Sequence, residues 1–177
     1  MHDLLLRDAA MAAAVLAFFA SAWFGWAQER PPAGWKALLA IGSVGSVLVA
    51  GATGVLAAVN WSSGSVLDDQ ARFESYLVIV GIEFGVASLG AGVLALRRGF
   101  AYIAPWVCLV VGVHFFPMAS VLGNPGFYVL AVVLTVLAFA APLLAARRGV
   151  PVSFATGASA GTVLLLFALW SVAGLLG

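Results

Sequence analysis

Two side chains that can exchange protons lie deep inside apolar stretches of this sequence. Glu83 stands in the middle of SYLVIVGIEFGVASLGAGVLAL, and His114 stands in the next apolar stretch, three residues before Pro117. A carboxylate and an imidazole can together bind, release or pass on a proton, and ionisable groups inside a membrane mark functional sites by default. Glu83 and His114 are therefore the candidate catalytic residues, either for proton exchange or with Glu83 as a general acid.

The spacing of these two residues predicts that they lie at the same depth on neighbouring helices. Glu83 lies fourteen residues before Arg97, and His114 lies fourteen residues after Phe100, on the far side of a short RRGF turn. At ~1.5 Å per helical residue, both sit about 21 Å from that turn. Helices joined by so short a turn run antiparallel and side by side, so the two side chains can meet if the helix faces that carry them agree. Pro117 removes a backbone N–H, which predicts a kink beside the histidine.

Three arrangements would let Glu83 reside in a membrane: it can stay protonated, pair with His114 or face water. A charged acid at the centre of a membrane helix costs roughly 2.5–3.5 kcal/mol. Apolar surroundings and a neighbouring imidazolium act in opposite directions on the proton affinity of a carboxyl group, so proton exchange at physiological pH is expected. The alternative is structural, a hydrogen bond that only joins two helices and contributes roughly 0.6–2 kcal/mol.

The composition identifies the class of protein that carries this pair. Of the 177 residues, 64% are hydrophobic and only 8% are charged, whereas soluble domains have about 25% charged residues. The composition therefore predicts an integral membrane protein. A net charge of +1 does not provide the basic patch that nucleic acids require, and the single Cys108 excludes an intrachain disulfide or a CxxC redox pair.

Six apolar runs are each long enough to cross a bilayer, which takes about 20 residues. The connections between them are short and contain proline, glycine and charged residues. We predict an all-α integral membrane protein, a single bundle of six transmembrane helices in which residues 1–177 form one domain. The expected spans are roughly 9–28, 36–60, 74–96, 101–121, 126–146 and 151–175.

Lysine and arginine residues gather on one side of the predicted bundle. The first, third and fifth connections contain six of them, whereas the opposite side has two, Arg7 and Arg72. The positive-inside rule then places both termini outside the cytoplasm. We expect a multi-pass protein of the inner (plasma) membrane of the cell, with the connection at 61–74 facing outward.

Small residues recur every four positions in the first two spans, which predicts close packing between these helices. The two ribbons are Ala9, Ala13, Ala17, Ser21 and Gly25, and Gly42, Ser46, Ala50, Gly54 and Ala58. The alternative is that the first ribbon docks a partner subunit. Gly81 and Gly85 lie on a different face from Glu83 and are likewise expected to be packing contacts. Five tryptophans near span ends, among them Trp106, are expected at the membrane interface.

Several further residues are candidates for ligand binding around the pair. Tyr76 is expected on the helical face of Glu83, and Phe84, Phe115 and Phe116 are the neighbouring aromatic residues. Polar residues at nearby span ends would form a vestibule above the pair, or else a solvated connection. They are Asn60, Asp68, Asp69, Arg72, Glu74 and Asn124.

The intramembrane residues also limit the cofactors. No span contains a central lysine for a retinal Schiff base, and one intramembrane histidine cannot provide bis-histidine haem ligation. Glu83 and His114 offer two metal ligands at most. We therefore expect neither a metal nor a cofactor.

The leading hypothesis is a small, proton-coupled membrane transport or ligand-binding protein whose Glu83–His114 site opens outward. Its partners would be the lipid bilayer and a small-molecule or lipid-like ligand, and six helices are few for alternating access, which favours a homodimer. The rival is a membrane-embedded enzyme that acts on a lipid or isoprenoid substrate, with Glu83 as general acid. A third possibility is a structural assembly partner without a ligand.

Overall fold

Six long helices make up most of residues 6–176, the part of the chain described by this computed structural model. They are α1 (Leu6–Ala27), α2 (Trp35–Val59), α3 (Gln70–Leu96), α4 (Ile103–Val121), α5 (Gly126–Arg148) and α6 (Val152–Leu176), with three short 3₁₀ turns, η1 (Trp61–Ser63), η2 (Val66–Asp68) and η3 (Phe100–Tyr102). Each long helix has the length and apolar composition to cross a membrane. The structure confirms the prediction of an all-α six-helix membrane bundle.

The helices match the expected spans to within four residues at every end. The largest difference is at the start of α3, which begins at Gln70, four residues earlier than expected. The Asp69 side chain caps this helix, because its Oδ1 accepts a hydrogen bond from the Arg72 backbone N–H at 2.9 Å.

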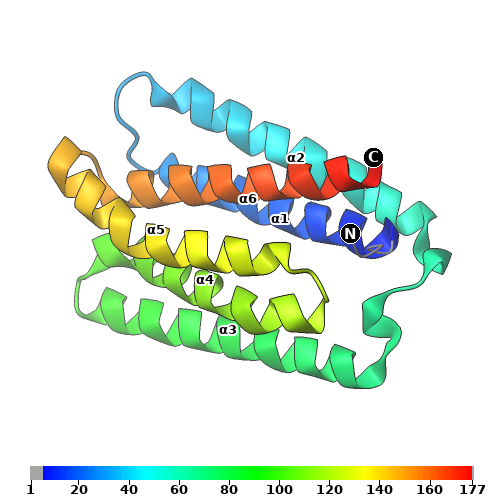
Figure 1. Ribbon diagram of the computed structural model, residues 1–177. Helices are drawn as coiled ribbons and strands as arrows, with labels where there is room; N and C mark the ends of the chain where they lie inside the picture. The colour runs from blue at the N-terminus through cyan, green and yellow to red at the C-terminus, as the bar shows by residue number, and fades with distance from the viewer. Residues whose placement is uncertain (1–5, 177) are drawn as a thin grey trace.

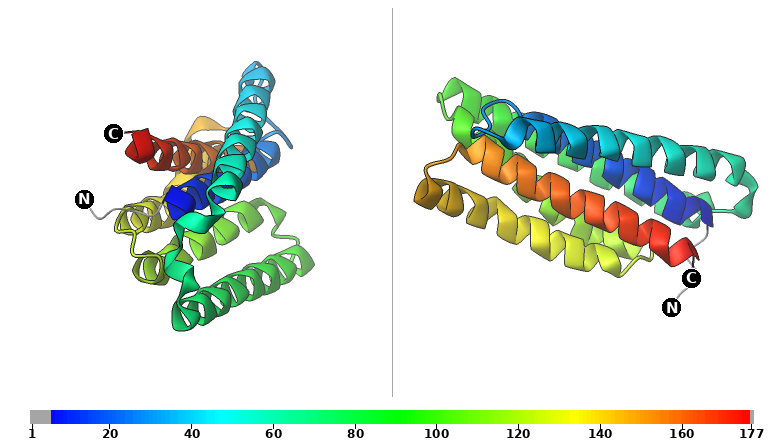
Figure 2. Two further views of the ribbon diagram at one scale, coloured as in Figure 1. Left: turned by 90° about the vertical axis from the view of Figure 1, so that its right-hand side faces the viewer. Right: turned by 90° about the horizontal axis from the view of Figure 1, so that it is seen from above.

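The six helices form two groups that meet at α6 (Figure 1). In one group α1 contacts both α2 and α6, and in the other α4 contacts both α3 and α5. Helix α6 joins the groups because it also contacts α4 and α5. The end-on view in Figure 2 shows α2 and α3 at opposite edges of the bundle. The start of α1 and the end of α6 lie at the same end of the molecule.

The core is formed mainly by α1, α4, α5 and α6, whereas none of the 27 residues of α3 is buried. Helices α1 and α2 pack against each other, as predicted, and Ser43 Oγ donates a hydrogen bond to the Ser21 carbonyl at 3.2 Å. The predicted ribbons do not pack along their whole length, since Gly25 and Ala58 are exposed and a Cβ at Gly54 would meet no atom within 4 Å.

Helix α1 also packs against α6. There a Cβ added at Gly157 would lie 2.7 Å from the Trp23 carbonyl oxygen. Helix α1 thus has two close neighbours, of which the sequence indicated one.

Gly81 and Gly85 are not packing contacts within this chain, so that prediction is wrong for the single chain. Both are exposed, and a Cβ at either position would meet no atom within 4 Å. The reason is the position of α3 at the edge of the bundle, where only the face with Glu83 turns toward α4.

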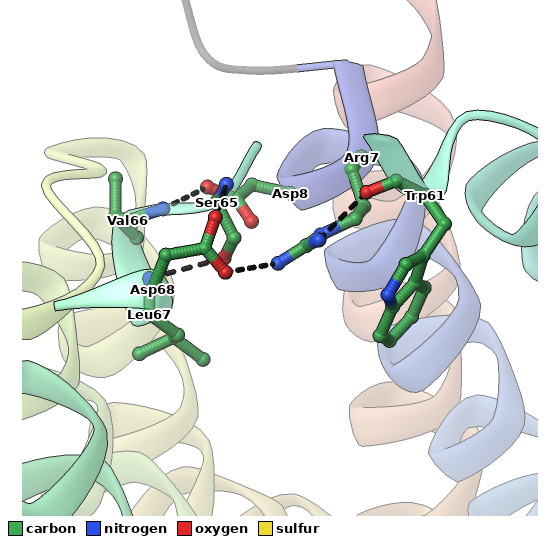
Figure 3. Close-up of polar contacts among 7 residues, drawn as sticks. All are labelled: Arg7, Asp8, Trp61, Ser65, Val66, Leu67 and Asp68. Atoms are coloured by element: carbon green, nitrogen blue, oxygen red, sulfur yellow. Dashed lines mark hydrogen bonds and ion pairs between the residues drawn. The ribbon is translucent and has the colours of Figure 1, made fainter. Parts of the chain in front are cut away.

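Arg7 ties the start of α1 to the connection between α2 and α3 (Figure 3). Its Nη1 donates to the Trp61 carbonyl oxygen and its Nη2 to Asp68 Oδ1, both at 2.8 Å. The guanidinium carbon also lies 4.5 Å from the centroid of the Trp61 ring. Next to it, Asp8 Oδ2 accepts a hydrogen bond from the Val66 N–H at 2.8 Å. These contacts hold the connection against α1.

We expect the Arg7–Asp68 contact to be present at neutral pH and to be lost only in strong acid. The hydrogen bond from Arg7, followed by that from the Ser65 N–H, holds the pKa of Asp68 below its ordinary value of 3.8. A group with a lowered pKa adds stability above its unfolded-state pKa, and this stability disappears as the pH falls through the lower folded-state value.

The Ser65 amide, which donates to Asp68 Oδ2 at 2.8 Å, reports on the role of Asp68. Its hydrogen exchange at neutral pH should be faster in Asp68→Asn than in the wild type, and equal rates would contradict this role.

Candidate functional site

Glu83 of α3 and His114 of α4 are in contact, which their matched depth allows. The distance between His114 Nδ1 and Glu83 Oε1 is 3.5 Å. Both side chains are largely shielded by the protein itself, with 12% of the histidine and 15% of the glutamate side chain exposed. The two groups therefore form one site at the interface between α3 and α4.

The face of α3 that turns toward α4 carries Tyr76, Glu83, Ala87 and Gly90, which are among the half-buried residues of this helix. Trp106 fixes the register of the two helices, because its Nε1 donates to the Ala87 carbonyl oxygen at 3.2 Å. A Cβ at Gly90 would collide with the same indole ring. Trp106 is thus a contact between α3 and α4, a role that its position near a span end did not indicate.

The hydrogen bonds of His114 identify its tautomer. Its Nδ1 lies 2.6 Å from the carbonyl oxygen of Val111, one turn earlier in α4. A carbonyl oxygen can only accept, so Nδ1 carries the hydrogen and Nε2 is left as the ring nitrogen that can take up a proton. The Glu83 oxygen, at 3.5 Å, is a longer second neighbour of that Nδ1–H.

Of the aromatic candidates, Phe115 contacts His114, whereas Phe84 and Phe116 are exposed. Phe115 is buried, and its ring centroid lies 4.2 Å from that of His114 and 5.3 Å from that of Phe127. Phe84 and Phe116 face the exterior, with 55% and 39% of each residue exposed. Tyr76 lies two turns from Glu83 on the same face and packs on the core.

The polar residues expected to form a vestibule each make a hydrogen bond within the protein. Asn60 Nδ2 donates to the Leu56 carbonyl at the end of α2, and Asp69 caps α3. Arg72 Nη1 donates to the carbonyl of Val121 at 3.1 Å and so joins the start of α3 to the end of α4. The remaining three do the same, since Asp68 binds Arg7, Glu74 accepts from Gln70 and Asn124 accepts from the Gly126 N–H.

An open, apolar groove of about 500 Å³ lies away from the pair, between α1 and α2. Its lining residues are Ala14, Val15, Phe18, Phe19, Val47, Ala50 and Gly51. Within residues 6–176, no group of three or more histidine, cysteine, aspartate or glutamate side chains gathers in a way that would hold a metal ion. Glu83 and His114 are the two ionisable side chains in contact at the site.

The fold and the site together define a multi-pass membrane protein in which a carboxyl group and an imidazole are in contact between α3 and α4. No protein-family model, curated protein or solved structure matches this chain. Its function is accordingly inferred from the geometry of the site.

His114→Leu should destabilise the protein by roughly 0.6–2 kcal/mol, because it removes the polar partner of Glu83 within the membrane. His114→Asn should retain most of the stability, since the asparagine amide can donate from nearly the position of Nδ1 to Val111 and Glu83. Thermal unfolding of the purified variants in detergent measures the difference. Equal stability of the leucine and asparagine variants would show that the Nδ1–H donor contributes nothing.

Proposed function

We propose that this is a small membrane transport or ligand-binding protein in which the Glu83–His114 pair exchanges a proton as the ligand binds. The observation that carries the proposal is the 3.5 Å contact between these side chains inside two spans. An ionisable residue within a membrane helix that faces a titratable partner is a functional-site hypothesis by default.

The length of the contact favours proton exchange over a purely structural hydrogen bond. N–H···O bonds measure about 2.7–3.2 Å, and the 3.5 Å between His114 Nδ1 and Glu83 Oε1 exceeds this range. The Nδ1–H instead bonds to the Val111 carbonyl oxygen, at 2.6 Å. In the part of the chain that the structure describes, Glu83 has no hydrogen bond at all. A carboxyl group without a hydrogen bond can change its protonation state without breaking one. A purely structural contact between two helices would not need this property.

Linkage gives the direction of the coupling. A ligand that brings a positive charge or a hydrogen-bond donor to Glu83 favours the carboxylate, so its binding releases a proton, and proton uptake in turn releases the ligand. His114 modulates this exchange through Nδ1–H and can store a second proton on Nε2. Helix α6 contains no aspartate, glutamate, histidine, lysine or arginine, and α5 contains only Arg147 and Arg148, in its last turn at the far end of the bundle. The two side chains therefore respond chiefly to each other and to the ligand.

The position of the pair supports access from the end of the molecule that holds Arg7. His114 lies seven residues before Val121, the end of α4, which is about 10 Å along the helix axis. The concentration of six cations at the other end favours a cytoplasmic location for that end, with both termini outside. Because α3 has no buried residue, the proposal includes a homodimer in which a second copy of the chain packs against α3.

An enzyme acting on a lipid or isoprenoid substrate is the less favoured function. That mechanism needs an apolar chamber around the general acid, and Phe84 and Phe116 face the exterior while Phe115 packs against Phe127.

A thermal-shift panel of cationic small molecules and lipid-like amines at about pH 5.5 and 7.5 tests the proposal, because this interval spans the range in which such pairs exchange protons. Compounds that stabilise the wild type should do so more strongly at the higher pH, and Glu83→Gln should remove this difference. Ligands whose effect is independent of pH, or whose pH dependence survives in Glu83→Gln, would contradict the proposal.

A further inference from the structure

The cations at the two ends of the bundle are in different environments. At one end both arginines have partners, since Arg7 binds Asp68 and Trp61, and Arg72 binds Val121. At the other end all six cations are exposed, and none donates a side-chain hydrogen bond or forms an ion pair within residues 6–176. These six are Arg30, Lys36, Arg97, Arg98, Arg147 and Arg148.

The connections that carry the six cations lie at one end of the molecule (Figure 1) and adjoin the start of α6. The Trp35 ring at the start of α2 packs edge-on against Phe154, with centroids 5.3 Å apart. The turn η3, directly after Arg98 and Gly99, contacts α6 as well. The cations therefore belong to one surface, which we call the basic end.

Exposed aromatic residues mark the level at which the basic end meets the membrane. Trp35, Phe100 and Tyr102 are 43%, 64% and 59% exposed, and each lies within two residues or one turn of a cation in the sequence. Tryptophan and tyrosine side chains are enriched at the level of the lipid headgroups. The cations and these exposed aromatic residues thus lie at the same end of the bundle.

The backbone at Arg98 adds a third observation. Helices α3 and α5 end in the same kind of turn, in which the Gly99 N–H bonds to the Leu94 carbonyl and the Val150 N–H bonds to the Ala145 carbonyl. The left-handed position of this turn holds glycine in α5, Gly149 at φ 63°, but arginine in α3, Arg98 at φ 57°. A residue with an L side chain is disfavoured in that conformation. Arginine therefore occupies a position at which glycine would have the lower conformational energy.

We propose that the basic end binds the headgroup phosphates of anionic phospholipids. The guanidinium group presents a planar fork of donors that matches phosphate oxygens, and five of the six cations are arginines. Anionic lipids attract such juxtamembrane cations, each of which contributes to binding near the surface. The exposed rings would lie among the same headgroups. This inference is independent of the Glu83–His114 site.

The test is competition between phosphatidylglycerol and phosphatidylcholine for the detergent-purified protein, measured by native mass spectrometry. The wild type should retain phosphatidylglycerol preferentially, and each removed cation should weaken its binding about fivefold. The variant with Arg97, Arg98, Arg147 and Arg148 all changed to Gln should lose the preference, whereas Arg72→Gln at the opposite end should keep it. An unchanged preference in the fourfold variant would overturn the proposal, and so would full displacement of the lipid by millimolar inorganic phosphate.

Arg98→Gly keeps the proposal testable if the fourfold variant does not fold. Glycine relieves the left-handed conformation, so this variant should unfold in detergent at the same temperature as the wild type or a higher one. Its affinity for phosphatidylglycerol should nevertheless fall about fivefold. A variant that is at least as stable and binds the lipid as tightly as the wild type would overturn the proposal.

Discussion

Glu83→Gln should remove the proton exchange of this protein and leave its fold intact. Glutamine has nearly the shape of glutamate and keeps a carbonyl oxygen beside His114 Nδ1, which is 3.5 Å from the carboxylate in the wild type. It cannot ionise, so the group that takes up the proton is lost. Because measured interhelical hydrogen bonds average about 0.6 kcal/mol, the stability should change by no more than roughly that amount.

A pH-indicator dye measures the number of protons released when the purified protein is taken from about pH 5 to about pH 8, the range in which such pairs titrate. Glu83→Gln should release about one proton fewer than the wild type in this interval. Glu74→Gln is the matched control, since Glu74 is exposed at the start of α3 and bonded to Gln70. Equal proton release from wild type and Glu83→Gln would contradict the assignment of Glu83.

Gly157→Ala should be strongly destabilising, although it adds a single methyl group. The new Cβ would lie 2.7 Å from the Trp23 carbonyl oxygen and 2.9 Å from the Ala27 backbone nitrogen. Both atoms belong to the backbone of α1, so relief requires α1 and α6 to move apart. Overpacking of this kind typically costs about 1–3 kcal/mol, which should lower the thermal unfolding temperature in detergent clearly.

Gly81→Ala is the control for this substitution. Gly81 also lies inside a helix, but a Cβ there would meet no atom within 4 Å. Alanine in such a position is expected to stabilise the helix by roughly 0.5–1 kcal/mol relative to glycine. The two variants should therefore shift the unfolding temperature in opposite directions. A Gly157→Ala protein as stable as Gly81→Ala would show that α1 and α6 are not packed as closely as described.

The helices and the matched depth of the central pair were predictable because they depend on properties that sequence expresses directly. Apolar runs and their breaks located all six helices to within four residues. The matched depth of Glu83 and His114 followed from equal numbers of residues on either side of a short turn and a constant rise per residue, and the structure adds that their helix faces agree. Neither inference requires knowledge of how distant parts of the chain pack.

The remaining features depend on that packing and were not predictable. The small residues of α1 indicated a neighbour, but spacing alone cannot show that both α2 and α6 fill that role. The position of α3 at the edge leaves Gly81 and Gly85 without contacts. The donation of His114 Nδ1 to Val111 depends on a side-chain torsion angle, and the role of Trp106 depends on Gly90 lying opposite to it.

The most direct test of the Glu83–His114 site is infrared difference spectroscopy of the protein in lipid bilayers between about pH 8 and pH 5, where the pair is proposed to exchange its proton. The wild type should show the C=O stretch of a protonated carboxyl group that appears on acidification and depends on His114, because His114→Asn should alter its midpoint. Glu83→Gln should lack this band, and Glu74→Gln should retain it. A carboxyl band that is the same in wild type and Glu83→Gln would contradict proton exchange at this site.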